Sequence, residues 1–419
     1  MEYIKRKIIK DLREHLRKPE ITLIIGPRQA GKTTVMRILE RELKDKNEKT
    51  VFFNLDIESD KEHFQSQEFL LKKIQLEIGE GRGYVFIDEI QRKENAGLFL
   101  KGLYDMQLPY KFIVSGSGSV ELKEKVKESL AGRKRLFELL PLSFEEFVNF
   151  KTQYRYENKL LEYFEVERIK SRMLLEEYMR FGGYPRIVLE DTLNEKYQEM
   201  NEIYHSYVEK HITYLLRVHK VEEFTRLVKL MAFHTGRLIN YSELASALRI
   251  SEKTVKEYLW YLEKTFILHR LTPFYRNPKK ELTKSQVVYF YDLGLRNFAE
   301  GSFMKEDYDR GFVFQNFVYG ILRGWAKDVH ASLHYWRTMN GAEVDFVIDM
   351  GREVIPIEVK YSSLKDVRIS KAFRSFIKKY NPKIAFIVNL DLKEKVNIDN
   401  TTVYVIPYYE LFIPLSRWI

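Results

Sequence analysis

A glycine-rich loop near the start of the chain holds the residues with the clearest chemical purpose. It consists of Gly26, Pro27, Arg28, Gln29, Ala30, Gly31, Lys32 and Thr33, which fit the pattern G-x-x-x-x-G-K-[ST]. An apolar run from Ile21 to Ile25 precedes the loop, and a helical pattern begins at Thr34. In such a loop the backbone N–H groups face phosphates, the lysine reaches the β- and γ-phosphates, and the threonine hydroxyl ligates Mg²⁺. We therefore expect residues 26–34 to bind ATP or ADP.

Two adjacent acids follow a second apolar run, Tyr84 to Ile87. Asp88 is predicted to hold Mg²⁺ through water, and Glu89 is predicted to polarise the water that attacks the γ-phosphate. The alternative is that both acids begin a solvated loop. Because they accompany a phosphate-binding loop, the pair predicts Mg²⁺-dependent hydrolysis of ATP and not only binding.

Strand and helix patterns alternate through the first part of the chain. The expected strands cover residues 21–25, 51–55, 84–88 and 111–115, and amphipathic stretches such as Val35-Leu39-Leu43 lie between them. This alternation predicts an α/β fold in which helices cover a parallel sheet.

Polar residues after the fourth expected strand add to the candidate site. Ser115 to Ser119 alternate with glycine at the carboxyl edge of the sheet, where ligands of open α/β sheets bind. Ser115 or Ser117 is therefore expected to contact the γ-phosphate, with an ordinary Gly/Ser turn as the alternative. Arg133 is a candidate arginine finger for the γ-phosphate of its own or a neighbouring subunit, although exposed basic clusters are usually only solvated.

The composition narrows the class of protein. The 419 residues are 45% hydrophobic and contain no cysteine, so disulfides, zinc–thiolate sites and a cysteine nucleophile are excluded. No apolar stretch approaches about 18 residues and no signal-peptide pattern is present, so we expect a cytoplasmic protein with no membrane partner. The net charge of +10 favours a partner that carries phosphates, such as DNA, although solubility or an anionic membrane surface would also suit it.

The middle of the chain is predicted to be helical and then to form a winged helix. Residues 154–218 suggest a helical lid or linker that Phe181-Gly-Gly-Tyr-Pro185 interrupts. Residues 240–263 indicate two helices joined by a tight turn, with Ser251 capping the second, and alternating apolar runs at 266–274 and 287–291 suggest a β-hairpin wing. The residues expected to contact DNA are Lys253, Thr254 and Lys256 on the second helix and Arg276, Lys279 and Lys280 in the wing. A protein-contact module is the alternative.

A second group of acids lies near the C-terminus. Glu343 and Asp345 share one face of an alternating run, and Glu358 and Lys360 share one face of the next, so the two runs should pair as an antiparallel hairpin. Asp345 and Glu358 could ligate Mg²⁺ or Mn²⁺, and Lys360 could lower the pKa of a metal-bound water that attacks a phosphodiester. A charged surface hairpin is the alternative. The order of the acids, a preceding helix at 312–323 and a strand at 332–336 indicate a PD-(D/E)xK nuclease-type fold.

Taken together, these motifs resemble a prokaryotic, mostly archaeal family of AAA+/STAND-like ATPases whose C-terminal part contains winged-helix and restriction-endonuclease-like regions. The resemblance rests on GPRQAGKTT, FIDEIQ, SLAGR with LLPLSFEEF, GGYP, TVKEYLWYLEKTFILHRL, KKELTKSQVVYFYDLGLRN, and EVDF with IEVK. It implies ATPase activity and possible homo-oligomers. The expected domains are a P-loop ATPase at 1–150, a helical lid at 151–218, a winged helix at 219–300 and a nuclease-like domain at 301–419.

The chain departs from the nuclease pattern at one position. Nucleases of this fold often carry an acid on the first helix of the domain, and the counterpart here is Gln315. Because a neutral amide binds a hard cation less well than a carboxylate, cleavage is in doubt. Our main hypothesis is therefore ATP hydrolysis coupled to DNA binding or processing. The alternatives are an ATP-driven switch that binds a protein partner and a metal-dependent nuclease.

Overall fold

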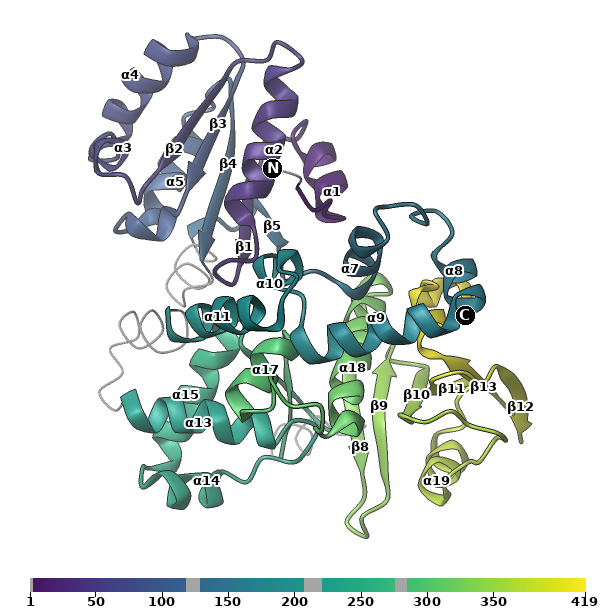
Figure 1. Cartoon of the computed structure of the whole chain (residues 1–419). Helices are drawn as coiled ribbons and strands as arrows, with labels where there is room; N and C mark the ends of the chain where they lie inside the picture. The colour runs from purple at the N-terminus through teal and green to yellow at the C-terminus, as the bar shows by residue number, and fades with distance from the viewer. Residues whose placement is uncertain (1–2, 118–128, 207–220, 276–284) are drawn as a thin grey trace. The chain divides into compact units, whose positions relative to one another are not determined.

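The structure is a computed structural model that describes residues 3–117, 129–206, 221–275 and 285–419. The chain divides into two compact units (Figure 1). The first comprises Met1–Phe150, Gly183–His219 and Tyr258–Ile267. The second comprises Lys151–Gly182, Lys220–Glu257 and Leu268–Ile419. Each unit therefore draws on segments that are far apart in the sequence.

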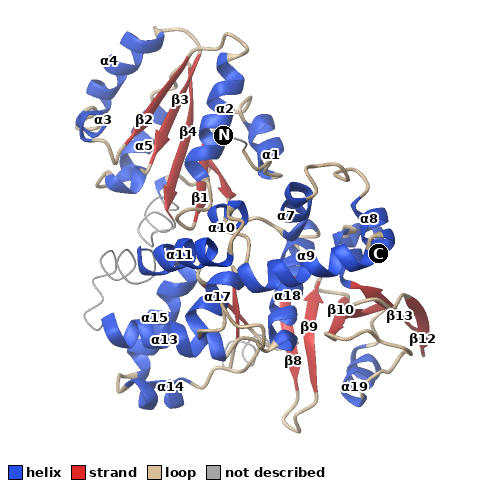
Figure 2. Cartoon of the chain, in the orientation of Figure 1, coloured by secondary structure: helices blue, strands red, loops and turns tan. Residues whose placement is uncertain are grey.

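A parallel sheet forms the centre of the first unit (Figure 2). Its strand order is β2-β3-β4-β1-β5, and every neighbouring pair is parallel, as the alternating pattern predicts. The strands are β1 (Ile21–Gly26), β2 (Thr50–Asn54), β3 (Gly83–Asp88), β4 (Tyr110–Ser117) and β5 (Lys134–Glu138). Because β4 lies between β1 and β3, the glycine-rich loop and the Asp88-Glu89 pair come from strands that are not adjacent.

Helices that connect the strands pack against the sheet, and other helices complete the first unit. They are α1 (Ile8–His15), α2 (Lys32–Lys44), α3 (Glu58–Glu62), α4 (Gln67–Ile78), η1 (Ile90–Arg92), α5 (Ala96–Asp105), α7 (Phe144–Lys151), α10 (Pro185–Leu189) and α11 (Leu193–Ile203). On α2 the expected apolar positions Val35, Leu39 and Leu43 are all buried. This helix begins at Lys32, two residues earlier than predicted, because Gly31 adopts a left-handed conformation (φ 95°) and precedes the first turn directly.

The two glycines of the GGYP motif belong to different units. Gly182 has φ 75° and follows the last residue of α9 (Arg168–Phe181), and a Cβ on it would come within 2.4 Å of the Asp292 carboxylate in the second unit. A Cβ on Gly183 would lie 2.3 Å from the carbonyl oxygen of Leu142 in the first unit. Both positions therefore require glycine, each for packing within its own unit.

Helices α8 (Leu160–Val166), α9, α13 (Val221–Phe233), α14 (Tyr241–Leu248) and α17 (Leu293–Glu300) lie in the second unit, while α15 (Glu252–Lys264) crosses the division between the units. A three-residue turn separates α14 from α15, and the Ser251 hydroxyl accepts a hydrogen bond from Thr254 N at 3.1 Å, as expected for an N-cap. Strands β6 (Leu268–Leu271) and β7 (Val287–Phe290) pair antiparallel, also as predicted.

A six-stranded sheet forms the rest of the second unit, in the order β12-β13-β11-β10-β9-β8. Strands β8 (Ser332–Arg337), β9 (Glu343–Asp349) and β10 (Val354–Val359) form an antiparallel meander, and β11 (Ile384–Asn389) runs parallel to β10. The sheet is completed by β12 (Glu394–Ile398) and β13 (Thr401–Pro407). Helices α18 (Arg310–Asp328) and α19 (Lys371–Tyr380) pack on it, and η3 (Tyr408–Phe412) and η4 (Leu415–Arg417) end the chain.

Among the residues that the structure describes, no helix combines the length and apolar character needed to cross a membrane.

Candidate functional sites

The glycine-rich loop connects β1 to α2 with two left-handed residues, Gln29 (φ 58°) and Gly31 (φ 95°). Gly26 ends β1 where β5 leaves the sheet, and a Cβ there would lie 1.9 Å from the carbonyl oxygen of Leu139. No side chain fits at that distance, so Gly26 is required by close backbone packing. The side-chain oxygen of Gln29 is buried and has no hydrogen-bond partner in the described part of the chain. The left-handed turns and the unpaired Gln29 side-chain oxygen are both features of a ligand-binding loop.

Lys32 is almost fully buried at the start of α2. Its ammonium donates to the carbonyl oxygens of Gly26 (3.2 Å) and Pro27 (2.8 Å). Burial lowers the pKa of Lys32, and attraction to Glu89 and Asp88 opposes that shift. Charged phosphate oxygens are stronger acceptors than carbonyl oxygens, so a bound triphosphate would draw the ammonium away from its own loop.

The predicted Mg²⁺ ligands Thr33 and Asp88 lie together. Thr33 Oγ1 donates to Asp88 Oδ2 at 2.6 Å, and the Ser115 hydroxyl on β4 donates to the other carboxylate oxygen of Asp88. Asp88 is 1% exposed, whereas Thr33 is exposed at the surface. Hydroxyl and carboxylate oxygens are hard ligands, and these two lie close enough to bind the same ion. Thr33 and Asp88 therefore fit Mg²⁺.

Glu89 follows β3 in a left-handed conformation (φ 55°), which is uncommon for a residue other than glycine. Its backbone N–H donates to Asp88 Oδ1 at 3.1 Å, and the Gln91 side-chain amide donates to its carboxylate. The Gln91 hydrogen bond orients the Glu89 carboxylate. Sequence analysis did not single out Gln91, although its place two residues after the acid pair is a detectable signal.

Arg6 and Glu146 also support the loop, and sequence analysis missed both. Arg6 donates to the carbonyl oxygens of Ala30 (2.9 Å) and Leu140 (2.6 Å), and its Nε lies 3.2 Å from Glu146. The Glu146 carboxylate also accepts the backbone N–H groups of Lys7 and Ser143. Because the bonded residues are up to 139 positions apart, no local pattern could have revealed this arrangement.

Ser117 and Arg133 occupy opposite ends of the sheet. Ser117 is the last residue of β4 and pairs in register with Gly26, at the edge that carries the loop. The Arg133 carbonyl accepts the N–H of Ile21 at the other end of β1, and its guanidinium bonds Asp105 at 2.7 Å. Gly26 is five positions after Ile21 on β1, so about 16 Å separate the two residues. The hypothesis that Arg133 acts on the γ-phosphate of its own subunit is therefore wrong, and action on a neighbouring subunit stays a prediction.

The predicted DNA-contacting residues on α15 are partly engaged within the helix. Lys253 is exposed. The Thr254 hydroxyl lies 2.8 Å from the Ser251 hydroxyl, and Lys256 pairs with Glu252 at 3.9 Å and lies over the Tyr241 ring. The wing residues Arg276, Lys279 and Lys280 lie outside the described residues.

The C-terminal acids meet on β9 and β10. The pairing of Ile357 with Phe346 places Glu358 opposite Asp345. Lys360 Nζ lies 2.7 Å from Glu358 Oε1, and the Ser370 hydroxyl donates to Glu358 Oε2 at 3.0 Å. Glu343 instead lies 3.3 Å from Arg337 on the neighbouring strand. Asp345 and Glu358 therefore share one site with Lys360, whereas Glu343 pairs with Arg337.

Both carboxylate oxygens of Asp345 accept hydrogen bonds from neutral donors. Gln315 Nε2 on α18 donates to Oδ1 at 2.9 Å, and Val359 N donates to Oδ2 at 2.7 Å. Protein atoms surround the carboxyl group although the residue as a whole is partly exposed. Burial raises the pKa of Asp345 to about 7, against the Val359 hydrogen bond and the Lys360 charge, which lower it. Gln315, which the sequence resemblance set against an acid of nucleases, thus donates a hydrogen bond to Asp345.

The raised pKa predicts a pH-dependent stability. The unfolded chain releases this proton near pH 4 and the folded chain near pH 7, so the folded state binds more protons in that window and the free energy of unfolding falls as the pH rises through it. Asp345→Asn removes the titration, so in EDTA its stability relative to the native chain should improve by up to about 4 kcal/mol between pH 4 and pH 7. Chemical denaturation at both ends of the window measures this. The exposed control Asp366→Asn should show no such trend, and a constant offset for Asp345→Asn would contradict the assignment.

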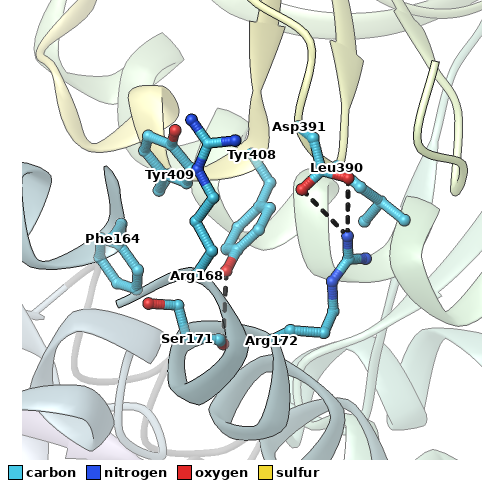
Figure 3. A pocket seen from close by; sticks show the side chains of 8 residues that line it. All are labelled: Phe164, Arg168, Ser171, Arg172, Leu390, Asp391, Tyr408 and Tyr409. Atoms are coloured by element: carbon cyan, nitrogen blue, oxygen red, sulfur yellow. Dashed lines mark hydrogen bonds and ion pairs between the residues drawn. The ribbon is translucent and has the colours of Figure 1, made fainter. Parts of the chain in front are cut away.

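Within the described ranges, no three acids or histidines gather in a cluster that could hold a metal ion. A narrow pocket in the second unit lies between α8, α9 and the η3 segment (Figure 3). Its lining residues are Phe164, Arg168, Ser171, Arg172, Leu390, Asp391, Tyr408 and Tyr409. Arg172 pairs with Asp391 at 3.2 Å, and Tyr408 donates to the Ser171 carbonyl at 3.4 Å. None of the predicted site residues lines this pocket. Two of its charged side chains, Arg172 and Asp391, already pair with each other.

Three family profiles match successive parts of the chain. Residues 18–148 match an AAA domain. Residues 172–306 and 310–411 each match a domain of unknown function, DUF8612 and DUF4143 respectively.

Similar proteins occur in archaea and bacteria. The uncharacterized protein MJ1544 of Methanocaldococcus jannaschii is 27% identical, covering 97% of this chain and 91% of that protein. The uncharacterized protein Rv2008c of Mycobacterium tuberculosis is 26% identical over 87% of this chain and 75% of its own length.

Solved structures give weaker similarities. The Aeropyrum pernix ORC1 protein in complex with DNA has a TM-score of 0.29 and 14% identity, covering 71% of this chain and 91% of that one. AMPPCP-bound DnaA from Aquifex aeolicus has a TM-score of 0.27 and 16% identity, covering 64% and 90%. Scores this low carry no argument about this chain. The AAA profile agrees with the glycine-rich loop and the parallel sheet on the same residues, so the segment 18–148 is an AAA-type P-loop domain.

Proposed function

We propose that the protein is an Mg²⁺-dependent ATPase whose nucleotide state controls how its later domains engage DNA. The observation that carries the ATPase part is the convergence of Lys32, Thr33, Asp88 and Glu89 at one edge of the parallel sheet. The four residues lie at or just after the carboxyl ends of β1 and β3, which β4 separates, and β4 itself supplies the Ser115 hydroxyl.

Each of these residues has a distinct role in the proposal. Lys32 neutralises charge on the β- and γ-phosphates, and the loop N–H groups bind the phosphate oxygens. Thr33 and Asp88 would hold Mg²⁺, which bridges phosphate oxygens and offsets their charge when bound. Glu89 orients the attacking water and accepts its proton. Ser115, whose hydroxyl contacts Asp88, or Ser117 would contact the γ-phosphate.

DNA binding is supported by the element order of the second part of the chain. Helices α13, α14 and α15 are followed by the antiparallel pair β6 and β7, which is the order of a winged helix. A winged helix can contact protein as well, so DNA is favoured mainly by the net charge of +10. Association into homo-oligomers, which would allow Arg133 to act on a neighbouring subunit, belongs to the same proposal.

Metal-dependent DNA cleavage receives less support. The order of α18, the β8-β9-β10 meander, α19 and β11 is the order expected of a PD-(D/E)xK nuclease-like fold, and Glu358 lies opposite Asp345 and beside Lys360. However, both carboxylate oxygens of Asp345 already accept hydrogen bonds, one from Gln315 and one from Val359. We therefore propose that this part of the chain holds nucleic acid without cutting it. Cleavage of duplex or branched DNA in Mn²⁺ that disappears in Asp345→Ala would overturn this view.

A salt titration tests the DNA part. A protein that neutralises six to ten phosphates should lose about 10³- to 10⁵-fold in duplex affinity between about 50 and 200 mM salt. Fluorescence anisotropy with a labelled duplex measures the slope. No binding at the lowest salt would favour the rival function, an ATP-driven switch that binds a protein partner.

A further inference from the structure

Helix α19 and its flanks carry a local excess of positive charge. Residues 365–383 contain seven Lys or Arg and one acidic residue, a net +6, compared with +10 for all 419 residues. On the helix itself, Lys371, Arg374, Lys378 and Lys379 are all exposed. We propose that this exposed face of α19, the basic face, binds the phosphate backbone of nucleic acid; the inference rests on the proposed DNA-binding function and names a contact surface for it.

The packing of α19 fixes which side chains face outward. Phe373, Phe376 and Ile377 are at most 1% exposed and pack into the core of the second sheet with residues of β9 and β10. With these three residues on the inner side, Lys371, Arg374 and Lys378 recur at helical spacing on the outer side. The basic face is therefore held in one orientation by the core of its own unit.

The charges of the basic face are unbalanced within the described part of the chain. None of Lys371, Arg374 and Lys378 lies within 4.0 Å of a described carboxylate oxygen, whereas the flanking Arg368 and Lys383 pair with Asp366 and Glu353. The first turn of α19 contains no acid, so Lys371 faces the positive end of the helix dipole. Arg374 and Lys378 are like charges four residues apart. Like charges at this spacing destabilise an isolated helix, and a bound polyanion would offset their repulsion.

The basic face begins beside the C-terminal acid site. Ser370 caps α19 through Phe373 N at 3.1 Å, and the same hydroxyl donates to Glu358 Oε2 at 3.0 Å. Glu358 in turn pairs with Lys360, whose side chain is 45% exposed. The N-cap residue of α19 is therefore bonded directly to the acid site, and the basic face starts at the next residue, Lys371.

The shape of the surface favours nucleic acid over a membrane. A helix that binds a membrane interface inserts an apolar face into it, but the apolar face of α19 is already used in the core. From Lys371 to Lys378 the helix advances about 10 Å, so its cations can contact successive phosphates along a backbone. Contacts of this kind carry no sequence preference, and their strength falls steeply with salt.

The test is the salt dependence of duplex binding by the full-length protein with Lys371, Arg374 and Lys378 all changed to Ala. Alanine keeps the helix propensity, and circular dichroism checks the fold. The slope of log affinity against log salt should become shallower by about 2.7, because three phosphate contacts are lost. Binding at low salt should weaken by at least roughly tenfold. The matched control changes Lys10, Arg17 and Lys46 to Ala, which removes the same charge from exposed positions of the first unit and should leave the slope nearly unchanged.

The outcomes separate this inference from the proposed function. If the native chain binds duplex and the α19 variant behaves like the control, the inference is wrong and the proposed function stands. If the native chain binds no duplex at low salt, both are wrong. If it instead binds vesicles of anionic lipid through Lys371, Arg374 and Lys378, a membrane is the partner and the inference is also overturned.

Discussion

Lys32→Ala should remove nucleotide binding. The side chain is almost fully buried and its ammonium already lies within the loop, 2.8 Å from the Pro27 carbonyl, so alanine removes a cation that is held where the phosphates would bind. Two charge-assisted hydrogen bonds to phosphate are worth about 3 to 6 kcal/mol, which corresponds to an affinity loss of at least about 100-fold. Titration of a fluorescent ATP analogue measures the loss.

Lys44→Ala is the matched control for this change. Lys44 ends the same helix, its side chain is 58% exposed, and it pairs with Glu40. The control should bind nucleotide with the affinity of the native chain. Near-native affinity in Lys32→Ala would show that the loop does not bind phosphates as proposed.

Glu89→Gln should separate binding from turnover. The neutral amide keeps the shape of the side chain but cannot accept the proton of the attacking water, so the hydrolysis rate should fall by about 10²- to 10⁴-fold while ATP affinity is retained. Single-turnover hydrolysis and equilibrium binding, measured on the same preparation, give both numbers. Glu94→Gln changes an exposed acid of the same loop and should hydrolyse normally. An unchanged rate in Glu89→Gln would assign the base to another residue.

Local patterns in the sequence were sufficient to predict the position of the glycine-rich loop and most strands. The glycine-rich loop, the expected strands of the first sheet and the C-terminal hairpin all follow from spacing within about 10 residues, because backbone geometry and side-chain alternation act over that range. The structure has these features where they were predicted, apart from the earlier start of α2 at Lys32.

Contacts between residues that are far apart in the sequence could not be predicted from local patterns. Arg6 and Glu146 support the loop from positions 24 and 116 residues away from Ala30, and nothing in the neighbouring residues of either marks them. The location of Arg133 depended on how β5 pairs with β1, which the sequence does not specify. The bond from Gln315 to Asp345 similarly depends on the packing of α18 against β9, and only the identity of the residue could be anticipated.

The two compact units illustrate the same limit. Motifs are found one after another along the sequence, so the sequence predicts domains that are consecutive segments of the chain. The structure instead assigns Gly183–His219 and Tyr258–Ile267 to the first unit. Segments that are not consecutive in the sequence can pack together because side-chain burial, not chain order, decides which elements associate.

The central claim is that ATP hydrolysis at the glycine-rich loop is coupled to DNA. The most direct test is the steady-state ATPase rate of the full-length protein, with Mg²⁺, in the presence and absence of single-stranded, duplex and branched DNA at low salt. The proposed function predicts a basal rate that one of these DNA structures increases and that Glu89→Gln abolishes in every condition. A measurable rate that no DNA structure changes, at concentrations where the DNA is bound, would contradict the coupling.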